Sequence, residues 1–151
     1  MATHSETIGE EKVGKAKAGD SALHCIIVTP ERTCLDEVVD SVVLPAFDGE
    51  VGVLRGHSPM LARLGHGELR TKLGGTVHRY FVDGGFAQVR DDVVTILTHR
   101  AIPADQVDTA TANKDLERAE DLPSTSEHEF KIRERAFARA RGMIRVARSK
   151  R

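Results

Sequence analysis

Apolar and polar residues change their spacing once along the chain, near Pro103. From Ala22 to Ile102, apolar and β-branched residues recur in short runs, which are typical of strands. Turn-forming residues separate the runs, and we interpret Gly65-His66-Gly67, Gly74-Gly75 and Asp83-Gly84-Gly85 as turns. We expect strands at residues 23–28, 35–39, 42–44, 51–54, 69–73, 76–82, 86–89 and 93–97. Many short strands at close spacing predict an antiparallel β-sandwich of about 8–10 strands.

The rest of the chain has a helical pattern, in which glycine nearly disappears and Ala, Glu, Lys and Arg dominate. We expect one helix from about Ala104 to Asp121, ended by Leu122-Pro123, and a second that continues to about Arg148. Ser124 and Glu127 have the spacing of a capping box at the start of the second helix. The predicted fold class is therefore mainly β plus α, a β-sandwich followed by a two-helix antiparallel hairpin.

These patterns divide the chain into a flexible polar tail at residues 1–21, the sandwich at 22–103 and the helical hairpin at 104–151. The second helix has one narrow apolar stripe, and the first has few large apolar residues. The stripe consists of Phe130, Phe137, Ala140, Ile144 and Ala147. Burial of so few large side chains barely offsets the entropy cost of ordering the hairpin. We therefore expect the hairpin to be stable only when docked, and able to exchange with an extended arrangement.

Composition limits the possible functions. A length of 151 residues and a mass of 16.5 kDa exclude a large multidomain enzyme. Apolar residues make up 40% of the chain and charged residues 30%, with a net charge of −1, which is typical of a globular protein. No apolar run approaches the roughly 20 residues that span a bilayer, so we expect no direct membrane insertion. Residues 1–21 match neither a secretory nor a transit peptide.

Charge is unevenly distributed within this balanced total. Residues 104–121 carry a net charge of −4, residues 127–151 carry +6, and residues 1–103 carry −3. Basic residues repeat every four positions in the second helix, where like charges repel one another. These residues are Lys131, Arg135 and Arg139, and then Arg141 and Arg145. We expect an acidic surface to face this helix, supplied partly by the first helix and partly by an external partner.

The residue types that usually carry catalysis or bind metal form no recognisable pattern. The seven histidines show no HExxH or comparable metal motif, and GxSxG, Walker A and dinucleotide-binding motifs are absent. Cys25 and Cys34 have no second Cys/His pair at zinc-ligand spacing, and we expect both to be reduced, half-buried strand residues. We therefore predict no catalytic residue, no metal site and no cofactor.

Two segments of the sandwich region are specific enough to indicate a family. The first is Gly49-Glu50-Val51-Gly52-Val53-Leu54 followed by Gly56-His57-Ser58-Pro59-Met60-Leu61, and the second is Phe81-Val82-Asp83-Gly84-Gly85-Phe86-Ala87-Gln88-Val89. Both resemble the epsilon subunit of bacterial F-type ATP synthase. The order of parts, a sandwich and then two helices, is also similar to that family, and the resemblance covers about Leu23 to Arg148.

The resemblance implies a non-catalytic subunit of the F1 central stalk, peripheral to the cytoplasmic face of the cell membrane. In the family, the sandwich binds the gamma subunit and rests on the polar loops of the membrane c-ring, coupling ion translocation to rotary ATP synthesis. Glu50 takes the position of a ring-contacting carboxylate, with Arg55, His57 and Ser58 in a neighbouring interface loop. From the residues alone, Glu50 could instead be a solvated loop residue, and His57 could serve only to fix its own loop.

The resemblance also implies that the two helices form an arm. In the family, this arm folds beside the sandwich or extends toward the catalytic beta and alpha subunits and restrains ATP hydrolysis. The basic residues that would meet an acidic loop on the beta subunits are Lys131, Arg135, Arg139, Arg141 and Arg145. The alternative is a solvated basic face paired with the first helix.

Some members of the family bind ATP on the folded hairpin. Asp108, Arg141 and Arg145 match parts of that pattern, but Thr111 stands where the family has an arginine, which removes a charge-assisted contact. The resemblance therefore does not lead us to predict a bound nucleotide. Arg55 also departs from the proline found in many relatives.

Two functions from other classes remain open from the residues alone. One is a nucleic-acid-binding module that uses the basic last helix, although Phe130 and Phe137 lie on its apolar stripe and the chain has no Trp. The other is a small metal-dependent β-sandwich enzyme, which the scattered histidines disfavour. The resemblance favours neither of them, and it implies no nucleic-acid partner.

Overall fold

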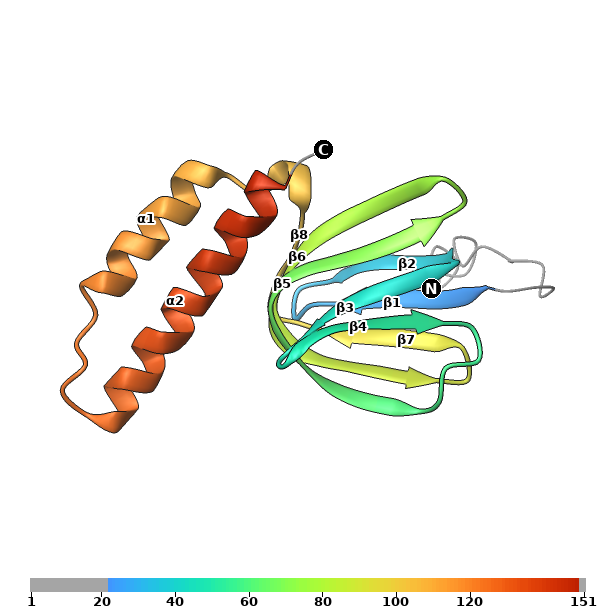
Figure 1. Cartoon of the computed structure of the whole chain (residues 1–151), viewed down its shortest axis with the longest axis horizontal. Helices are drawn as coiled ribbons and strands as arrows, with labels where there is room; N and C mark the ends of the chain where they lie inside the picture. The colour runs from blue at the N-terminus through green and yellow to red at the C-terminus, as the bar shows by residue number, and fades with distance from the viewer. Residues whose placement is uncertain (1–21, 150–151) are drawn as a thin grey trace, which may run out of the picture.

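The computed structural model describes residues 22–149, so the tail expected at residues 1–21 lies outside the described residues. Figure 1 shows a β-sandwich with two antiparallel helices packed beside it, which confirms the predicted fold class. The chain order is β1 (Leu23–Val28), β2 (Thr33–Val39), β3 (Ser41–Ala46), β4 (Gly49–Leu54), β5 (Met60–Leu73), β6 (Thr76–Arg90), β7 (Val93–Leu97), β8 (Ala101–Pro103), the 3-10 helix η1 (Ala104–Gln106), α1 (Thr109–Glu120) and α2 (Glu127–Arg148).

The eight strands form one hydrogen-bonded sheet that folds over into the sandwich. The strand order is β2-β1-β7-β6-β5-β3-β4, with β8 paired to β6. All pairs are antiparallel except β1 and β7, which run parallel. The expectation of a purely antiparallel sheet was therefore wrong at this pair, because β1 and β7 are joined through the whole intervening sheet and not by a hairpin.

β5 and β6 are long, and each enters both layers of the sandwich (Figure 1). Their pairing keeps one register from Met60↔Val89 to Leu73↔Thr76. We predicted turns at Gly65-His66-Gly67 and Asp83-Gly84-Gly85, and this prediction was wrong. The two segments face each other within the ladder of β5 and β6. The φ angles of Gly84 (70°) and Gly85 (103°) are positive, as a glycine pair allows. The two segments bend the ribbon without interrupting it.

The strands are generally longer than their apolar runs. The predicted strand at residues 69–73 is only the last part of β5, which begins at Met60. The predicted strands at 76–82 and 86–89 are both parts of β6. The short β8 was missed, because three residues give no measurable alternation.

Alternation along β5 and β6 separates two cores. Leu69 and Val82 point into the sandwich, whereas Phe81 points out toward the helices. The second core consists of Phe81, Ala104, Val107, Ala112, Met143, Val146 and Ala147, with Ile102 and Ile144 packed against it. The sandwich therefore has an interior of its own, and Phe81 is its buried contact with the arm.

The segment predicted as a single helix from Ala104 to Asp121 is divided. Ala104–Gln106 form a 3-10 turn, and α1 begins only at Thr109. Asp108 is the N-cap, and its carboxylate accepts hydrogen bonds from the Ala110 backbone N–H (3.0 Å) and the Thr111 hydroxyl (2.8 Å). An N-cap has extended backbone, so Asp108 cannot lie inside a helix that runs through it.

α2 spans Glu127–Arg148, which confirms the predicted end. Its capping box is formed by Ser126 and Glu129, so the prediction of Ser124 and Glu127 was wrong by two residues. The Ser126 hydroxyl accepts from the Glu129 N–H (3.1 Å), and the Glu129 carboxylate accepts from the Ser126 N–H (3.3 Å). The cap must directly precede the first helical residue, and Ser126 alone does so.

The buried face of α2 confirms the predicted stripe at Ala140, Ala147 and the partly buried Ile144, but not at the two phenylalanines. It consists of Ala140, Gly142, Met143, Val146 and Ala147, whereas Phe130 is 52% exposed and Phe137 is half-buried. At Gly142 the helix backbone lies against β5, where an added Cβ would be 2.4 Å from the His66 carbonyl oxygen and 3.3 Å from the Phe81 ring. This close approach turns small residues toward the sheet, and it leaves Phe130 in the first turn and Phe137 at the middle of the helix incompletely buried.

We predict that Gly142→Ala loosens the arm while increasing the intrinsic helicity of α2. Alanine favours helix over glycine by roughly 0.8–1 kcal/mol, but its Cβ would clash with the His66 carbonyl. Hydrogen exchange should become faster in residues 139–149, whereas exchange in β1, β6 and β7 should not change. Gly52→Ala is the matched control, because no atom lies within 4 Å of a Cβ at Gly52. Unchanged exchange in Gly142→Ala would contradict this packing argument.

Candidate functional site

The outward face of β5 and β6 carries a row of polar residues directly beneath α2. On β5 these residues are His66, Glu68 and Arg70, and on β6 they are Asp83, Phe81 and Arg79, which lie opposite them in that order. The side chains share one face because residues two apart on a strand point the same way. The sheet therefore presents charged groups to the helix on both sides of Phe81.

Asp83 forms the first charged group of this row. Its side chain is only 6% exposed, and its Oδ1 atom lies 2.7 Å from His66 Nδ1 and accepts a hydrogen bond from Arg139 Nε of α2 at 2.9 Å. Arg100, which precedes β8, lies 3.5 Å from the other carboxylate oxygen. A buried carboxylate is thus neutralised by groups from both the sheet and the arm.

The surroundings of Asp83 keep it ionised. Burial alone would raise the pKa of Asp83, but hydrogen bonds from His66 and Arg139 and the charge of Arg139 outweigh it and lower the pKa to about 2. Since the ordinary value is 3.8, the ionised form stabilises the docked arm at every pH above about 4. That contribution is lost only as the pH falls from about 4 through 2.

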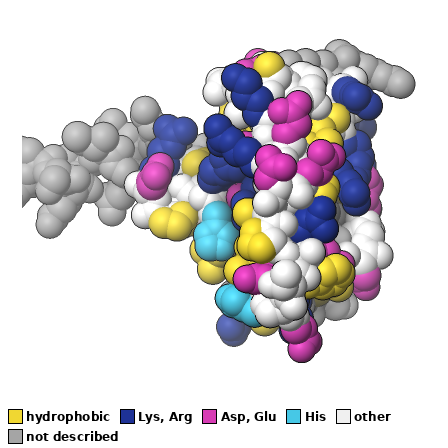
Figure 2. Space-filling model, turned by 90° about the vertical axis from the view of Figure 1, so that its left-hand side faces the viewer, with side chains coloured by type: hydrophobic (Ala, Val, Ile, Leu, Met, Phe, Trp, Pro, Cys, Tyr) yellow, Lys and Arg dark blue, Asp and Glu magenta, His cyan; other side chains and the backbone are white. Residues whose placement is uncertain are grey.

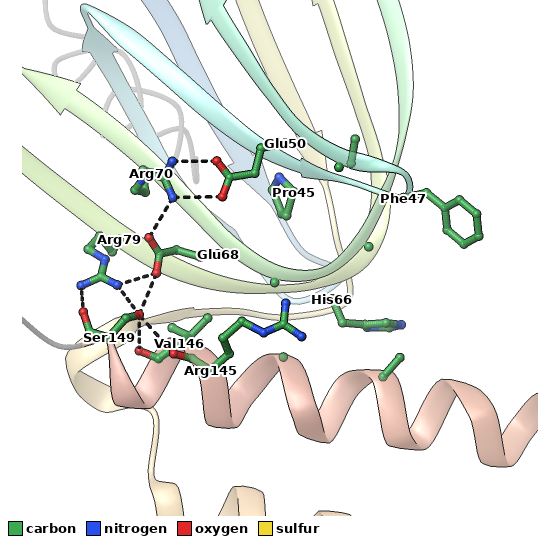
Figure 3. Close-up of a pocket in the computed structure, with 16 residues that line it drawn as sticks. Pro45, Phe47, Glu50, His66, Glu68, Arg70, Arg79, Arg145, Val146 and Ser149 are labelled. Carbon is green, nitrogen blue, oxygen red and sulfur yellow. Dashed lines mark hydrogen bonds and ion pairs between the residues drawn. The ribbon is translucent and has the colours of Figure 1, made fainter.

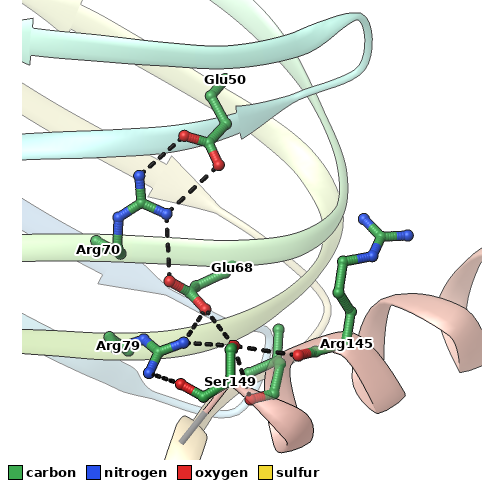
Figure 4. A network of polar contacts seen from close by, with 7 residues as sticks. Glu50, Glu68, Arg70, Arg79, Arg145 and Ser149 are labelled. Carbon is green, nitrogen blue, oxygen red and sulfur yellow. Dashed lines mark hydrogen bonds and ion pairs between the residues drawn. The ribbon is translucent and has the colours of Figure 1, made fainter. Parts of the chain in front are cut away.

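A second polar network runs from the β3–β4 hairpin to the end of α2 (Figures 3 and 4). Glu50 pairs with Arg70 (2.8 Å), and Arg70 pairs with Glu68 (3.2 Å). Glu68 pairs with Arg79 (2.5 Å), and Arg79 donates to the backbone carbonyl and hydroxyl of Ser149, which follows α2. Negative and positive side chains alternate along this network, so each one orients the next.

Hydrogen bonds within the network shift the pKa values of Glu68, Arg70 and Arg79. Burial would raise the pKa of Glu68, but hydrogen bonds from Arg79 and Arg70 outweigh it, and the net effect is a lowered pKa. Hydrogen bonding to Glu50 raises the pKa of Arg70, and hydrogen bonding to Glu68 raises that of Arg79. The hydrogen bonds around Glu68, Arg70 and Arg79 therefore favour the ionised form of each of these three side chains.

A cleft of about 640 Å³ lies between α2 and the sandwich (Figure 3). Glu50, Glu68, Arg70 and Arg79 line one side of it, and Arg145 and Val146 of α2 line the other. The Arg145 guanidinium points into this space, and it forms no ion pair within residues 22–149. Gly142, where the helix backbone touches the sheet, also lines this cleft.

The structure separates the residues expected to contact the ring. Glu50 is next to the first residue of β4, beside the arm, whereas Arg55, His57 and Ser58 follow the other end of this strand. The length of β4 places about 16 Å between Glu50 and Arg55. Arg55 lies 3.9 Å from Asp92, and His57 Nδ1 lies 2.7 Å from the carbonyl oxygen of Ser58. Glu50 and the loop therefore belong to two different regions of the sandwich surface.

The predicted basic residues of the arm have different surroundings. Lys131 pairs with Glu127 on the same helix (3.5 Å), Arg139 pairs with the buried Asp83, and Arg141 lies over the ring of Phe137. Arg135 and Arg145 form no ion pair within the described residues. Figure 2, which faces the side that the helices cover, shows basic and acidic side chains intermixed on this surface.

The expectation that the first helix would supply carboxylates to α2 was wrong for residues 22–149, where no ion pair joins the two helices. Arg133 instead donates to the carbonyl oxygens of Ala119 and Glu120 at the end of α1 (3.3 Å each). A cation at a helix C-terminus is favourable, because the free carbonyls carry partial negative charge. The carboxylate that faces α2 belongs to the sheet and is Asp83.

Asp108, Arg141 and Arg145, the three candidates for nucleotide contacts, have different surroundings and do not line one common pocket within the described residues. Both oxygen atoms of Asp108 accept hydrogen bonds from α1, and those bonds lower its pKa, the one from the Thr111 hydroxyl most strongly. Arg145 lines the cleft on the sandwich side, while Arg141 stacks on Phe137. Asp108 therefore has a structural role that needs no nucleotide.

An apolar patch lies on the outer face of the sandwich, outside the arm core, and one of its residues, Phe47, also lines the cleft beside α2. We define it as Phe47, Leu61, Phe86 and Leu97, which are 52–73% exposed. Phe86 pairs in register with Leu97 of β7 and with Arg63 of β5, and the Arg63 guanidinium lies 4.8 Å from the centre of the Phe47 ring. Four exposed large apolar side chains around one arginine are typical of a protein-binding surface.

Other features of the described residues point to no further chemistry. No group of His, Cys, Asp and Glu within residues 22–149 is arranged to hold a metal ion. Cys25 is fully buried, and burial is the largest effect that raises the pKa of its thiol to about 12, while Cys34 is half-buried. In the same part of the chain, no helix has the length and apolarity needed to cross a bilayer.

Sequence reasoning missed His66, Glu68, Arg70, Arg79 and Asp83. The signal was present in alternation and register. His66, Glu68 and Arg70 alternate with small or apolar residues, and the Gly74-Gly75 turn places His66 opposite Asp83 if β5 and β6 are read as uninterrupted. Because the glycine-rich segments were interpreted as turns, β5 and β6 were divided into shorter predicted strands and the pairing of His66 with Asp83 was not found.

Residues 22–104 match the family model described as the β-sandwich domain of the ATP synthase delta/epsilon chain. The ATP synthase epsilon chain of Rhodopirellula baltica is 53% identical over 127 residues, which cover 84% of this chain and 99% of that one. The epsilon chain of Nitratidesulfovibrio vulgaris strain DP4 is 46% identical over 101 residues, 67% of this chain and 75% of that one.

A solved structure is similar as well. It is a chain in the mitochondrial ATP synthase of Euglena gracilis, determined as a complex of OSCP, F1 and c-ring. The TM-score is 0.72 and the sequence identity 29%, over 83% of this chain and 82% of that one. The likeness therefore extends beyond the sandwich domain that the family model matches.

We predict that Asp83→Asn weakens docking of the arm at neutral pH. The substitution removes the charge that Arg139 and His66 share, and hydrogen bonds to a charged group contribute about 1.5–3 kcal/mol each. Amide exchange at residues 136–143 should accelerate, as measured by NMR at pH 7. Asp36→Asn is the control, because Asp36 pairs with His24 at the far side of the sheet. Equal protection in both variants would contradict the assignment of Asp83 as an anchor of the arm.

Proposed function

This chain belongs to the family of ATP synthase epsilon chains, and we propose that it couples ion translocation to rotary ATP synthesis and restrains ATP hydrolysis through its two helices. It is a non-catalytic subunit. The observation that carries the proposal is the two-part construction, a sandwich with an exposed apolar patch and an arm held by small residues and ion pairs. Neither the fold nor the relatives support the nucleic-acid-binding alternative.

The apolar patch is the proposed surface for the gamma subunit. A rotating shaft needs a partner that stays attached while torque passes through it, and burial of large apolar side chains gives such a contact. Leu61, Phe86 and Leu97 are exposed on strands of the sandwich and Phe47 in its β3–β4 turn, and none of the four belongs to the arm. The sandwich can therefore hold the shaft in either arrangement of the arm.

The ring contact is proposed at Glu50. Its side chain is 60% exposed, although it is paired with Arg70, so it can reach a donor on the polar loops of the c-ring. Arg55, His57 and Ser58 belong to the opposite end of β4 and would meet another part of the rotor. This arrangement would hold the chain at the cytoplasmic face of the membrane through other subunits.

The arm is proposed to act as an electrostatic brake against the catalytic beta and alpha subunits. Arg135, Arg141 and Arg145 form no ion pair with a carboxylate within residues 22–149 in the docked arrangement, so their charge is available to an acidic partner. Arg139 would have to leave Asp83 first. Asp83 keeps His66 and Arg100 when it does, which lowers the cost of releasing the arm.

We predict that Phe86→Asp weakens co-purification with the gamma subunit by about tenfold or more, because it places a charge in the middle of the apolar patch. Affinity for the purified gamma subunit, measured by titration calorimetry, is the direct test. Leu73→Asp is the matched control, since Leu73 is 50% exposed at the end of β5, outside the patch. If both variants bind gamma as the native chain does, the patch is not the shaft contact.

We predict that reversing the charges of Arg141 and Arg145 weakens the inhibition of ATP hydrolysis. In the assembled complex at low salt, the double variant should hydrolyse ATP about two- to fivefold faster, and salt should reduce the difference. Arg135→Glu should act in the same direction, because Arg135 is exposed on the arm away from the cleft. Arg90→Glu, on the sandwich, is the control. Unchanged latency in all arm variants would refute the brake.

A further inference from the structure

Building on the proposed function, we propose that the chain of ion pairs from Glu50 to Ser149 is a relay between the ring contact and the arm. A donor group that engages Glu50 would loosen the end of α2, and docking of α2 would in turn hold Glu50 back from that donor. The relay consists of Glu50, Arg70, Glu68, Arg79 and Ser149 (Figure 4).

The relay ends at the last turn of α2. Arg79 donates to the backbone carbonyl and to the hydroxyl of Ser149, and the Ser149 hydroxyl also contacts Glu68 Oε2 at 3.2 Å. The carbonyls at a helix C-terminus lack partners within the helix, so an arginine that binds there caps it. Arg79 belongs to the sheet, and this cap therefore joins the end of the arm to β6.

Glu68 is the branch point, because both of its oxygens are used. Oε2 accepts from Arg79 at 2.5 Å, while Oε1 accepts from Arg70 at 3.2 Å. Its side chain is only 16% exposed, so water does little to replace either arginine. Arg70 and Arg79 share this one carboxylate, so a change in the contact of one arginine alters the strength of the ion pair that the other forms with Glu68.

Glu50 competes with Glu68 for the guanidinium of Arg70. It takes both terminal nitrogens of Arg70, at 2.8 Å and 3.4 Å, and so draws the guanidinium toward the β3–β4 hairpin. When a cationic or amide donor occupies Glu50, Arg70 keeps Glu68 as its remaining carboxylate among the described residues. Arg70 then competes with Arg79 for Glu68, and the cap on Ser149 weakens.

This relay is separate from the anchor at Asp83. Asp83 holds Arg139, two and a half turns before the end of α2, and no hydrogen bond or ion pair among the described residues joins Asp83 to Glu68 or Arg79. Loss of the relay should therefore free the last turn first. Since binding couplings are reciprocal, a docked arm must weaken the engagement of Glu50 by the same factor that engagement weakens docking.

The test uses the full chain alone, with amide hydrogen exchange of residues 144–149 measured by NMR. Glu50→Ala should speed this exchange about two- to fivefold, which is the range for an exposed ion pair, although Glu50 does not contact α2. Asp48→Ala is the matched control, because Asp48 is an exposed carboxylate in the same hairpin and forms no ion pair among the described residues. It should leave the exchange unchanged.

Arg70→Ala separates a relay from simple loosening of the sheet edge. Removing Arg70 leaves Glu68 wholly to Arg79, so the exchange should stay equal or become slower. In the Arg70→Ala background, Glu50→Ala should have no further effect, since the signal passes through Arg70. The relay is overturned if Glu50→Ala has no effect, or if the two substitutions speed exchange additively. Neither measurement involves gamma or the ring, so a failed gamma titration would refute the proposed shaft contact and leave the relay intact.

Discussion

The backbone contact between α2 at Gly142 and β5 at His66 is the constraint on which the rest of the structure depends. A helix that touches a sheet this closely must turn its smallest residues inward, so its large apolar residues cannot all be buried. The same contact brings Arg139 to Asp83 and the end of the helix to Arg79. Packing at one glycine thus fixes which charges can meet.

The arm is held in a way that suits reversible docking. Phe81 is the one aromatic side chain in the core between the arm and the sheet within residues 22–149, and alanine, valine, methionine and isoleucine fill the remainder. Ion pairs supply the specificity that this small apolar area lacks. Ion pairs can be exchanged for other partners at modest cost, whereas a large apolar interface cannot. The composition of the interface therefore supports an arm that is able to leave.

The long β5–β6 ribbon carries polar and apolar residues at different places along the side that points away from the sandwich core. Where α2 packs on the ribbon it presents the charged row, and beyond the bend it contributes Leu61 and Phe86 to the exposed apolar patch. The patch and the contact with the arm therefore both include residues of β5 and β6, but they share none of them. In the proposed rotor, torque and regulation would pass through one rigid ribbon whose two ends have different chemistry.

The sequence by itself determined the sandwich, the pair of helices, the end of α2 and the family, because alternation, helical period and two specific motifs are local properties. Only the tertiary structure decided which face of α2 is buried, the parallel pairing of β1 and β7, and the carboxylate that meets the basic helix. Asp83 lies far from Arg139 along the chain, and Gly142 gives no apolar signal. Contacts of this kind depend on how two elements approach each other in space, which periodicity within either element cannot specify.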